Sequence, residues 1–269
     1  MPPKRLLPFI LPFVLLLSAA ALALPGAGCG GGGEQTSTSP PVASQESKTY
    51  SDNPESVSRL LKDTSATLGR EVSAGAGVHF TMDSTTTVAG QTVVSSGEGD
   101  MVFPTPLKMT TRNYTGGPSS PPVPVDVIMT GGVVYTRTAG GAWQSSQTAQ
   151  APDPGIVSTY LDYARSSQFL GQETLGNGRK TYHVQVNVDT ALAAEKAKQQ
   201  TSDPVLQKSL EDTKSSTVTL DLWLGVDDQL IYQEKINVNN PATGLSSNLN
   251  FIFANWGETV SIEKPCAAC

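Results

Sequence analysis

Histidine and cysteine are scarce in this chain: its 269 residues include two histidines and three cysteines. His79 and His183 stand far apart in strand-like segments, which argues against a catalytic triad or a histidine-based zinc site. The sequence also lacks a Gly-x-Ser-x-Gly nucleophile elbow, a phosphate-binding P-loop, and a dinucleotide fingerprint placed between a strand and a helix. These absences predict a protein that is not an enzyme and holds no metal or cofactor.

Positive charge is in short supply too, and the chain has no basic run. Two of the 18 Lys and Arg residues lie before residue 29 and all 24 acids lie after it, so the remainder carries a net charge of −8. Phosphate contacts need clustered Lys and Arg, which excludes nucleic acid as an expected partner. The same lack removes electrostatic attraction to anionic lipid headgroups, so covalent lipid is the expected means of holding the protein to a membrane.

The one long apolar run lies at the N-terminus. Lys4 and Arg5 precede the uncharged segment 6–24, and small residues then lead to Cys29. A basic start, an apolar middle and a small-residue exit are typical of a secretory signal peptide. A cysteine at the end of that exit is typical of a bacterial lipobox, in which the sulfur receives a diacylglyceryl group. We therefore expect a lipoprotein signal peptide over residues 1–28 and lipidation of Cys29 at the extracytoplasmic face of the cell membrane.

Two other readings of this segment stay open. Cleavage after Ala23 would make it an ordinary signal peptide, and its apolar run is just long enough for an uncleaved membrane anchor. Pro8 and Pro12 weaken the run as a membrane helix. Gly26 departs from the usual lipobox, where leucine is commonest three residues before the cysteine.

The remainder divides into a linker, one domain and a short tail. Residues 29–52 begin with four glycines after the cysteine and continue rich in Ser, Thr and Pro, which predicts a flexible linker. Residues 53–265 suit a single β-rich domain. In the tail 266–269, Cys266 and Cys269 have C-x-x-C spacing but no helix after them to lower a thiol pKa, so they form either a short disulfide or a free tail.

Apolar periodicity predicts an antiparallel meander interrupted by helices. Asn53 is a good N-cap for a first helix that we expect to stop at Gly69. A second helix should open at Asp153 and reach Ala164. Strands are expected over 78–88, 92–103, 107–114, 125–129, 133–137, 169–175, 182–188, 218–224, 230–238 and 245–256, with helices over 190–200 and 203–213. The predicted fold class is α+β: a strongly curved antiparallel sheet, or half-barrel, with helices packed on its concave face.

A gap between such a sheet and its helices would be an apolar cavity, whereas a filled core would place the same residue types in the same positions. The sequence physics leaves both open. The candidates for the lining are the inward-facing apolar residues Val57, Leu61, Phe80, Met82, Met101, Phe103, Met129, Ile156, Tyr160, Val184, Leu220, Leu222, Phe251 and Phe253. A one-residue register slip would invert each strand's contribution.

The sequence resembles the LppX/LprG-type family of actinobacterial lipoproteins. The anchor, the glycine-rich tether, the first helix, the runs 78–103 and 125–137, and Trp143 carry the resemblance, together with a hairpin over 222–232. That family is similar in fold to the LolA/LolB lipoprotein carriers. The resemblance implies a half-barrel with a hydrophobic pocket for acyl chains of envelope lipids or lipoglycans. The alternative is a structural or sensing lipoprotein that acts through protein contacts.

Overall fold

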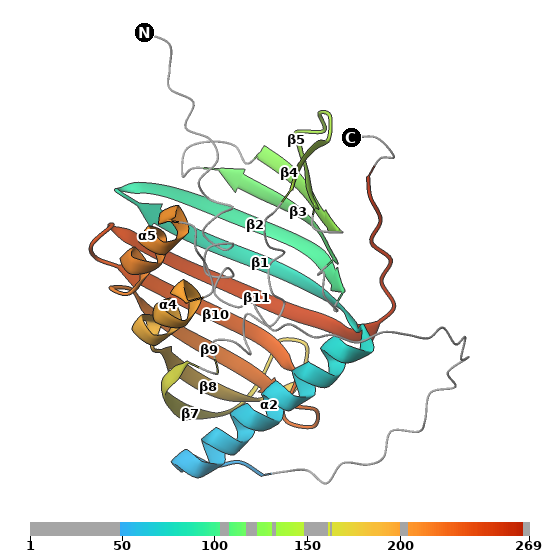
Figure 1. The fold of residues 1–269 in the computed structure, drawn as a ribbon. Coiled ribbons are helices and arrows are strands. Elements are labelled where there is room, and N and C mark those ends of the chain that lie inside the picture. The colour runs from blue at the N-terminus through green and yellow to red at the C-terminus, as the bar shows by residue number, and fades with distance from the viewer. Residues whose placement is uncertain are drawn as a thin grey trace, which may run out of the picture.

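One antiparallel sheet of eleven strands forms the body of the protein (Figure 1). The structure is a computed structural model that describes residues 49–102, 108–116, 123–130, 133–147, 161, 163–199 and 204–265. The strands are β1 (Gly77–Val88), β2 (Gln91–Val102), β3 (Lys108–Gly116), β4 (Val123–Thr130), β5 (Val133–Thr138), β6 (Gln144–Gln147), β7 (Ala164–Thr174), β8 (Lys180–Val188), β9 (Thr217–Gly225), β10 (Ile231–Asn240) and β11 (Leu245–Glu258). The expected fold class is confirmed: the sheet is curved and open, with helices beside it.

The sheet is a meander in which the first and last strands meet at the centre. Its order is β6-β5-β4-β3-β2-β1-β11-β10-β9-β8-β7, so β6 and β7 are the two edges. β1 pairs with β2 on one side and with β11 on the other, all antiparallel. The β1–β2 turn is formed by Ala89 and Gly90 with φ of 49° and 80°, the two positive values that a two-residue type I′ hairpin needs.

Helix α2 (Pro54–Ala74) runs longer than predicted. Asn53 caps it as expected, since its side chain accepts a hydrogen bond from the Ser56 amide at 2.8 Å. The predicted stop at Gly69 is wrong, because a glycine weakens a helix without ending it when the flanking residues pack. Leu68 and Val72, on either side of Gly69, pack against the core. The helix ends at Gly75, whose φ of 73° suits a left-handed cap.

Two further predictions near the middle of the chain need correction. Ala164 begins strand β7 rather than ending a helix, and the short strand β6 was not predicted. Residue 161 is helical, whereas residues 153–160 and 162 of the predicted helix, including Ile156 and Tyr160, lie outside the described residues. The expected helices after β8 are confirmed as α4 (Thr190–Lys198) and α5 (Pro204–Thr213).

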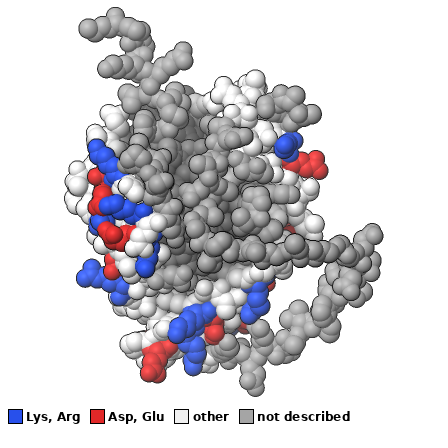
Figure 2. All heavy atoms as spheres, in the orientation of Figure 1, with Lys and Arg blue, Asp and Glu red and all other residues white. Residues whose placement is uncertain are grey.

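The helices lie at opposite ends of the strands (Figure 1). α2 crosses the end where β8 begins, and Tyr50, just before it, packs edge-on against Tyr182 with ring centroids 5.3 Å apart. α4 and α5 lie where β9 begins, and Thr190 Oγ1 donates to the Ser216 carbonyl at 2.7 Å. In Figure 2 charges of both signs gather over these helices. Lys214, just after α5, forms ion pairs with Glu195 of α4 and Glu211 of α5.

Candidate functional site

Strand register places the large apolar side chains on the inner face of the sheet. Phe80 of β1 lies opposite Phe253 of β11, and Met82 lies opposite Phe251. The neighbouring Ile252 points the other way and is 43% exposed. Alternate residues of a strand face opposite sides, so this register defines an apolar inner face and a polar outer face at the centre of the sheet.

Helix α2 covers one end of that inner face. Val57, Leu60 and Leu61 project from its buried side and join the main core cluster with residues of β1, β8, β9, β10 and β11. Tyr50 fixes the start of the helix, because its hydroxyl donates to Asp63 Oδ2 at 2.6 Å. Burial and this neighbouring carboxylate raise the pKa of Tyr50 above its ordinary value.

Most of the predicted lining residues meet in this main core. Seven are buried there: Val57, Leu61, Phe80, Val184, Leu220, Leu222 and Phe253. Three more, Met82, Met101 and Phe251, are partly buried and pack against it. Their contact with one another follows from the register, whereas contact with a ligand stays a prediction.

One predicted lining residue stands apart from the main core, and three others lie outside the described residues. Met129 is buried in a separate small cluster with Val127 and Val134 on β4 and β5. Phe103, Ile156 and Tyr160 lie outside the described residues, as do Cys29, Cys266 and Cys269. The described part of the inner face is therefore an apolar surface under α2 with a second apolar patch toward the β6 edge.

A carboxyl group interrupts this apolar surface. Glu234 of β10 lies opposite Leu222 of β9 and Phe251 of β11 in the register, and its side chain is 3% exposed. Burial raises the pKa of its carboxyl to about 8. Within the described residues its Oε1 has no hydrogen-bond partner, and the only other such buried side-chain atom is Thr64 Oγ1 of α2.

Sequence reasoning missed Glu234, although a signal was present. Ile236 and Val238 are the apolar members of an alternating strand, and counting back by two from Ile236 arrives at residue 234 on the same face. A strand was predicted over 230–238, but Glu234 was not assigned to either face.

The two histidines lie on the outer face with acidic partners. His79 Nδ1 is 2.9 Å from Asp100 Oδ1. His183 lies between Glu173 and Asp221 and stacks on Trp223 with ring centroids 4.2 Å apart.

Trp223 and His183 also affect the carboxylate of Glu173. Trp223 Nε1 donates to Glu173 Oε2 at 2.8 Å, and this bond, followed by that of His183, lowers the pKa of Glu173. The group braces β7, β8 and β9 on the face opposite the apolar surface. Among the described residues no cluster of His, Cys, Asp and Glu is suited to hold a metal ion.

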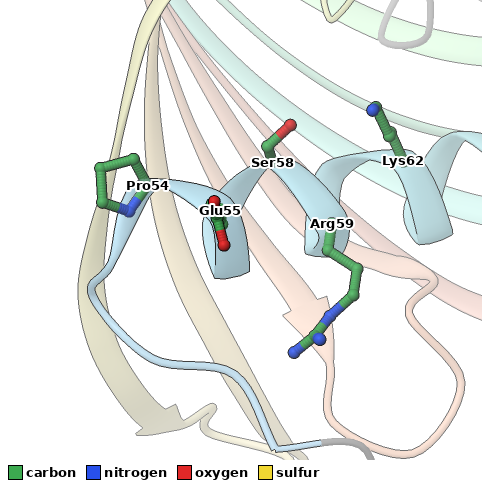
Figure 3. A pocket seen from close by; sticks show the side chains of 5 residues that line it. All are labelled: Pro54, Glu55, Ser58, Arg59 and Lys62. Carbon is green, nitrogen blue, oxygen red and sulfur yellow. The ribbon is translucent and has the colours of Figure 1, made fainter.

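A surface hollow lies on the exposed side of α2 (Figure 3). Its lining is Pro54, Glu55, Ser58, Arg59 and Lys62. Figure 3 shows Arg59 and Lys62 extending away from each other, and the hollow is open to solvent. It does not offer the apolar enclosure that an acyl chain needs. In the part of the chain that the structure describes, no helix has the length and apolar character to cross a membrane.

An open curved antiparallel sheet with an apolar, helix-covered inner face defines the half-barrel class of fold. Within that class the chain is similar to LprF from Mycobacterium bovis: 16% of residues are identical, the match covers 81% of this chain and 100% of LprF, and the TM-score is 0.51. The resemblance to the LppX/LprG-type family inferred from the sequence is thereby confirmed at the level of the fold.

Two further solved structures match at lower scores. A putative outer membrane lipoprotein-sorting protein domain from Vibrio parahaemolyticus shows 9% identity over 75% of this chain and 93% of that one, with a TM-score of 0.31. The MucA/MucB complex from Pseudomonas aeruginosa shows 16% identity over 74% of this chain and 59% of that one, with a TM-score of 0.36. No protein-family model and no curated protein sequence matches the chain.

Proposed function

We propose that the protein is an envelope lipoprotein, anchored through Cys29, that binds or carries acyl-chain lipids or lipoglycans against the inner face of its sheet. The observation that supports this most is the partial burial of Met82, Met101 and Phe251 on the concave face. Large apolar side chains left partly open on an inward surface offer an acyl chain contacts that water cannot match. Each buried CH₂ contributes about 0.8 kcal/mol.

The fold likeness to LprF supports the same proposal, because the LppX/LprG-type family that the sequence resembles implies a hydrophobic pocket for acyl chains. The proposal assigns no catalytic residue and no cofactor. The anchor would keep the domain at the extracytoplasmic side of the cell membrane, with residues 29–52 as the tether.

A second candidate function rests on the tight packing under α2. Leu60, Leu220 and Leu222 are fully buried there, as expected for a filled core. A protein of this kind would act through protein contacts, as a structural or sensing lipoprotein. The interior volume separates the two functions, since an acyl chain needs an enclosed space of several hundred Å³.

The test is native mass spectrometry of residues 34–269, which include every described element, purified from a lipid-rich host. We expect added mass that fragments into fatty-acyl species. A clean apo mass, together with no uptake of a fluorescent fatty acid, would reject the lipid proposal in favour of the second function.

A matched pair of variants on β11 locates the binding surface. Phe251→Asp places a charge on the inner face and should abolish lipid uptake, whereas Ile252→Asp places the same charge on the exposed outer face and should leave uptake unchanged. Unchanged uptake by a folded Phe251→Asp protein would show that lipid does not bind here.

A further inference from the structure

Strand β10 turns one carboxyl group toward the apolar interior. Its flanking polar residues face outward: Gln233 Nε2 donates to Asn250 Oδ1 at 2.7 Å, and Lys235 Nζ lies 5.1 Å from the Trp223 ring centroid. Glu234, between them, therefore faces inward with Ile236, and both are buried.

The two residues opposite Glu234 in the sheet are apolar. Its register partners are Leu222, which is fully buried, and Phe251, which packs against the main core. Oε1 has no hydrogen bond among the described residues, and no charged group contributes to the shift of the Glu234 pKa, which is caused by burial alone. A buried polar atom without a partner costs free energy, so its presence calls for a partner that the described chain does not supply.

We propose that Glu234 is the polar contact of the lipid site and pairs with a hydroxyl group of a neutral acyl lipid, such as an acylglycerol or a hydroxylated acyl chain. This inference rests on the proposed function and adds a chemical class of ligand to it. It also explains why a carboxyl group is kept where apolar side chains surround it.

The chemistry favours a neutral hydroxyl over a charged group. At neutral pH a buried carboxyl whose pKa is about 8 is mostly protonated, so it both donates and accepts, and a hydroxyl does the same. An ammonium group would have to be desolvated together with an ionised carboxylate, which costs several times more. A fatty-acid anion would place a second negative charge beside Glu234.

The experiment is a binding cycle with two short probes, 1-decanol and the alkane with the same number of heavy atoms. Short probes can seat the hydroxyl at Glu234 without a headgroup fixing their position. Dissociation constants are measured by displacement of a fluorescent fatty acid from residues 34–269, for the wild type and for Glu234→Leu. The change in the decanol-to-alkane ratio between the two proteins isolates the contact between Glu234 and the hydroxyl.

We expect the preference for decanol to fall roughly tenfold in Glu234→Leu, while alkane binding is kept or improved. Glu234→Gln, which can still donate and accept, should retain most of the preference. Ile236→Ala, on the same face of the same strand, should weaken both probes and leave their ratio unchanged.

A wild-type measurement does not depend on any variant folding. In infrared difference spectra, the band of the protonated Glu234 carboxyl should shift when decanol binds and stay in place when the alkane binds. An unchanged ratio in Glu234→Leu, or an unmoved carboxyl band, overturns the role of Glu234 while lipid binding stands. Failure of the wild type to take up either probe overturns the lipid function and this inference together.

Discussion

Thr64 is a residue at which a single substitution should increase the stability of the protein. It is fully buried on the inward side of α2, and its Oγ1 has no hydrogen-bond partner among the described residues. Replacing the hydroxyl by a methyl group of similar size removes an unpaired polar atom and buries apolar surface instead. We expect Thr64→Val to raise the free energy of unfolding by about 1 kcal/mol, measured by urea denaturation.

Thr67 provides the control for that change. It lies on the same side of α2 and is also buried, but its Oγ1 accepts a hydrogen bond from Arg70 at 2.9 Å. Thr67→Val loses that bond and should stabilise less than Thr64→Val, or destabilise. Equal gains in the two variants would show that the hydroxyl of Thr64 is satisfied in solution.

The carboxyl of Glu234 makes stability depend on pH in a defined direction. Burial raises its pKa from 4.5 to about 8 in the folded state. Between these values the folded protein holds one proton more than the unfolded chain, so the free energy of unfolding falls as pH rises. The contribution is fully present below the unfolded pKa and is lost as pH passes the folded one.

Glu234→Gln should remove that dependence. The stability of the variant relative to the wild type is therefore expected to grow from pH 5 to pH 8 by up to about 1.4 kcal/mol per pH unit. Urea denaturation of both proteins across this range measures the difference. A difference that stays flat with pH would mean that the Glu234 carboxyl is ionised in the folded protein.

At the scale of elements, α2 carries two glycines with opposite requirements. A Cβ at Gly69 would meet nothing within 4 Å, and the residue lies in the helix interior. Gly69→Ala should raise the free energy of unfolding by about 0.5–1 kcal/mol in thermal or urea denaturation. Gly75→Ala should lower it by about 1 kcal/mol, because φ at this cap is 73°. A gain at both positions would contradict the assigned end of the helix.

The elements could be predicted wherever alternation or a cap fixed them. β8 and β9 read directly from valine and leucine at every second position, and Asn53 marked the start of α2. The end of α2 was missed because local chemistry at Gly69 was outweighed by packing further along the helix. Strand β6 has four residues, which is too few to show an alternating pattern in the sequence. It is recognised as a strand only through its pairing with β5.

The candidate site was predictable to the level of faces and no further. Alternation placed Phe251 and Phe253 on one side and Ile252 on the other, as the register shows. The order of strands in the sheet depends on pairings between segments that are distant in the sequence. The separation of Met129 from the main core could therefore not be predicted from the sequence. Glu234 was missed because only apolar residues were considered as candidates for the inner face.

At the scale of the whole molecule, Cys29 decides where the domain resides. Cys29→Ser should release the protein from the membrane fraction in a bacterium that processes lipoproteins, because no acyl chain then holds it. Fractionation with mass spectrometry of the N-terminal peptide measures this. An unmodified cysteine in a membrane-bound wild type would instead favour an uncleaved anchor.

The pairing of β1 with β11 also sets the order of events during folding. Thr86 Oγ1 lies 2.7 Å from Ser247 Oγ across a sequence separation of 161 residues, so the central seam waits for nearly all of the chain. Until β11 is in place, the sheet consists of two separate parts, β1–β6 and β7–β10, whose edge strands β1 and β10 are unpaired on one side. Contacts this distant in sequence form slowly. A chain truncated within β11 should therefore form two unjoined partial sheets that proteases can cleave, rather than a less stable form of the same fold.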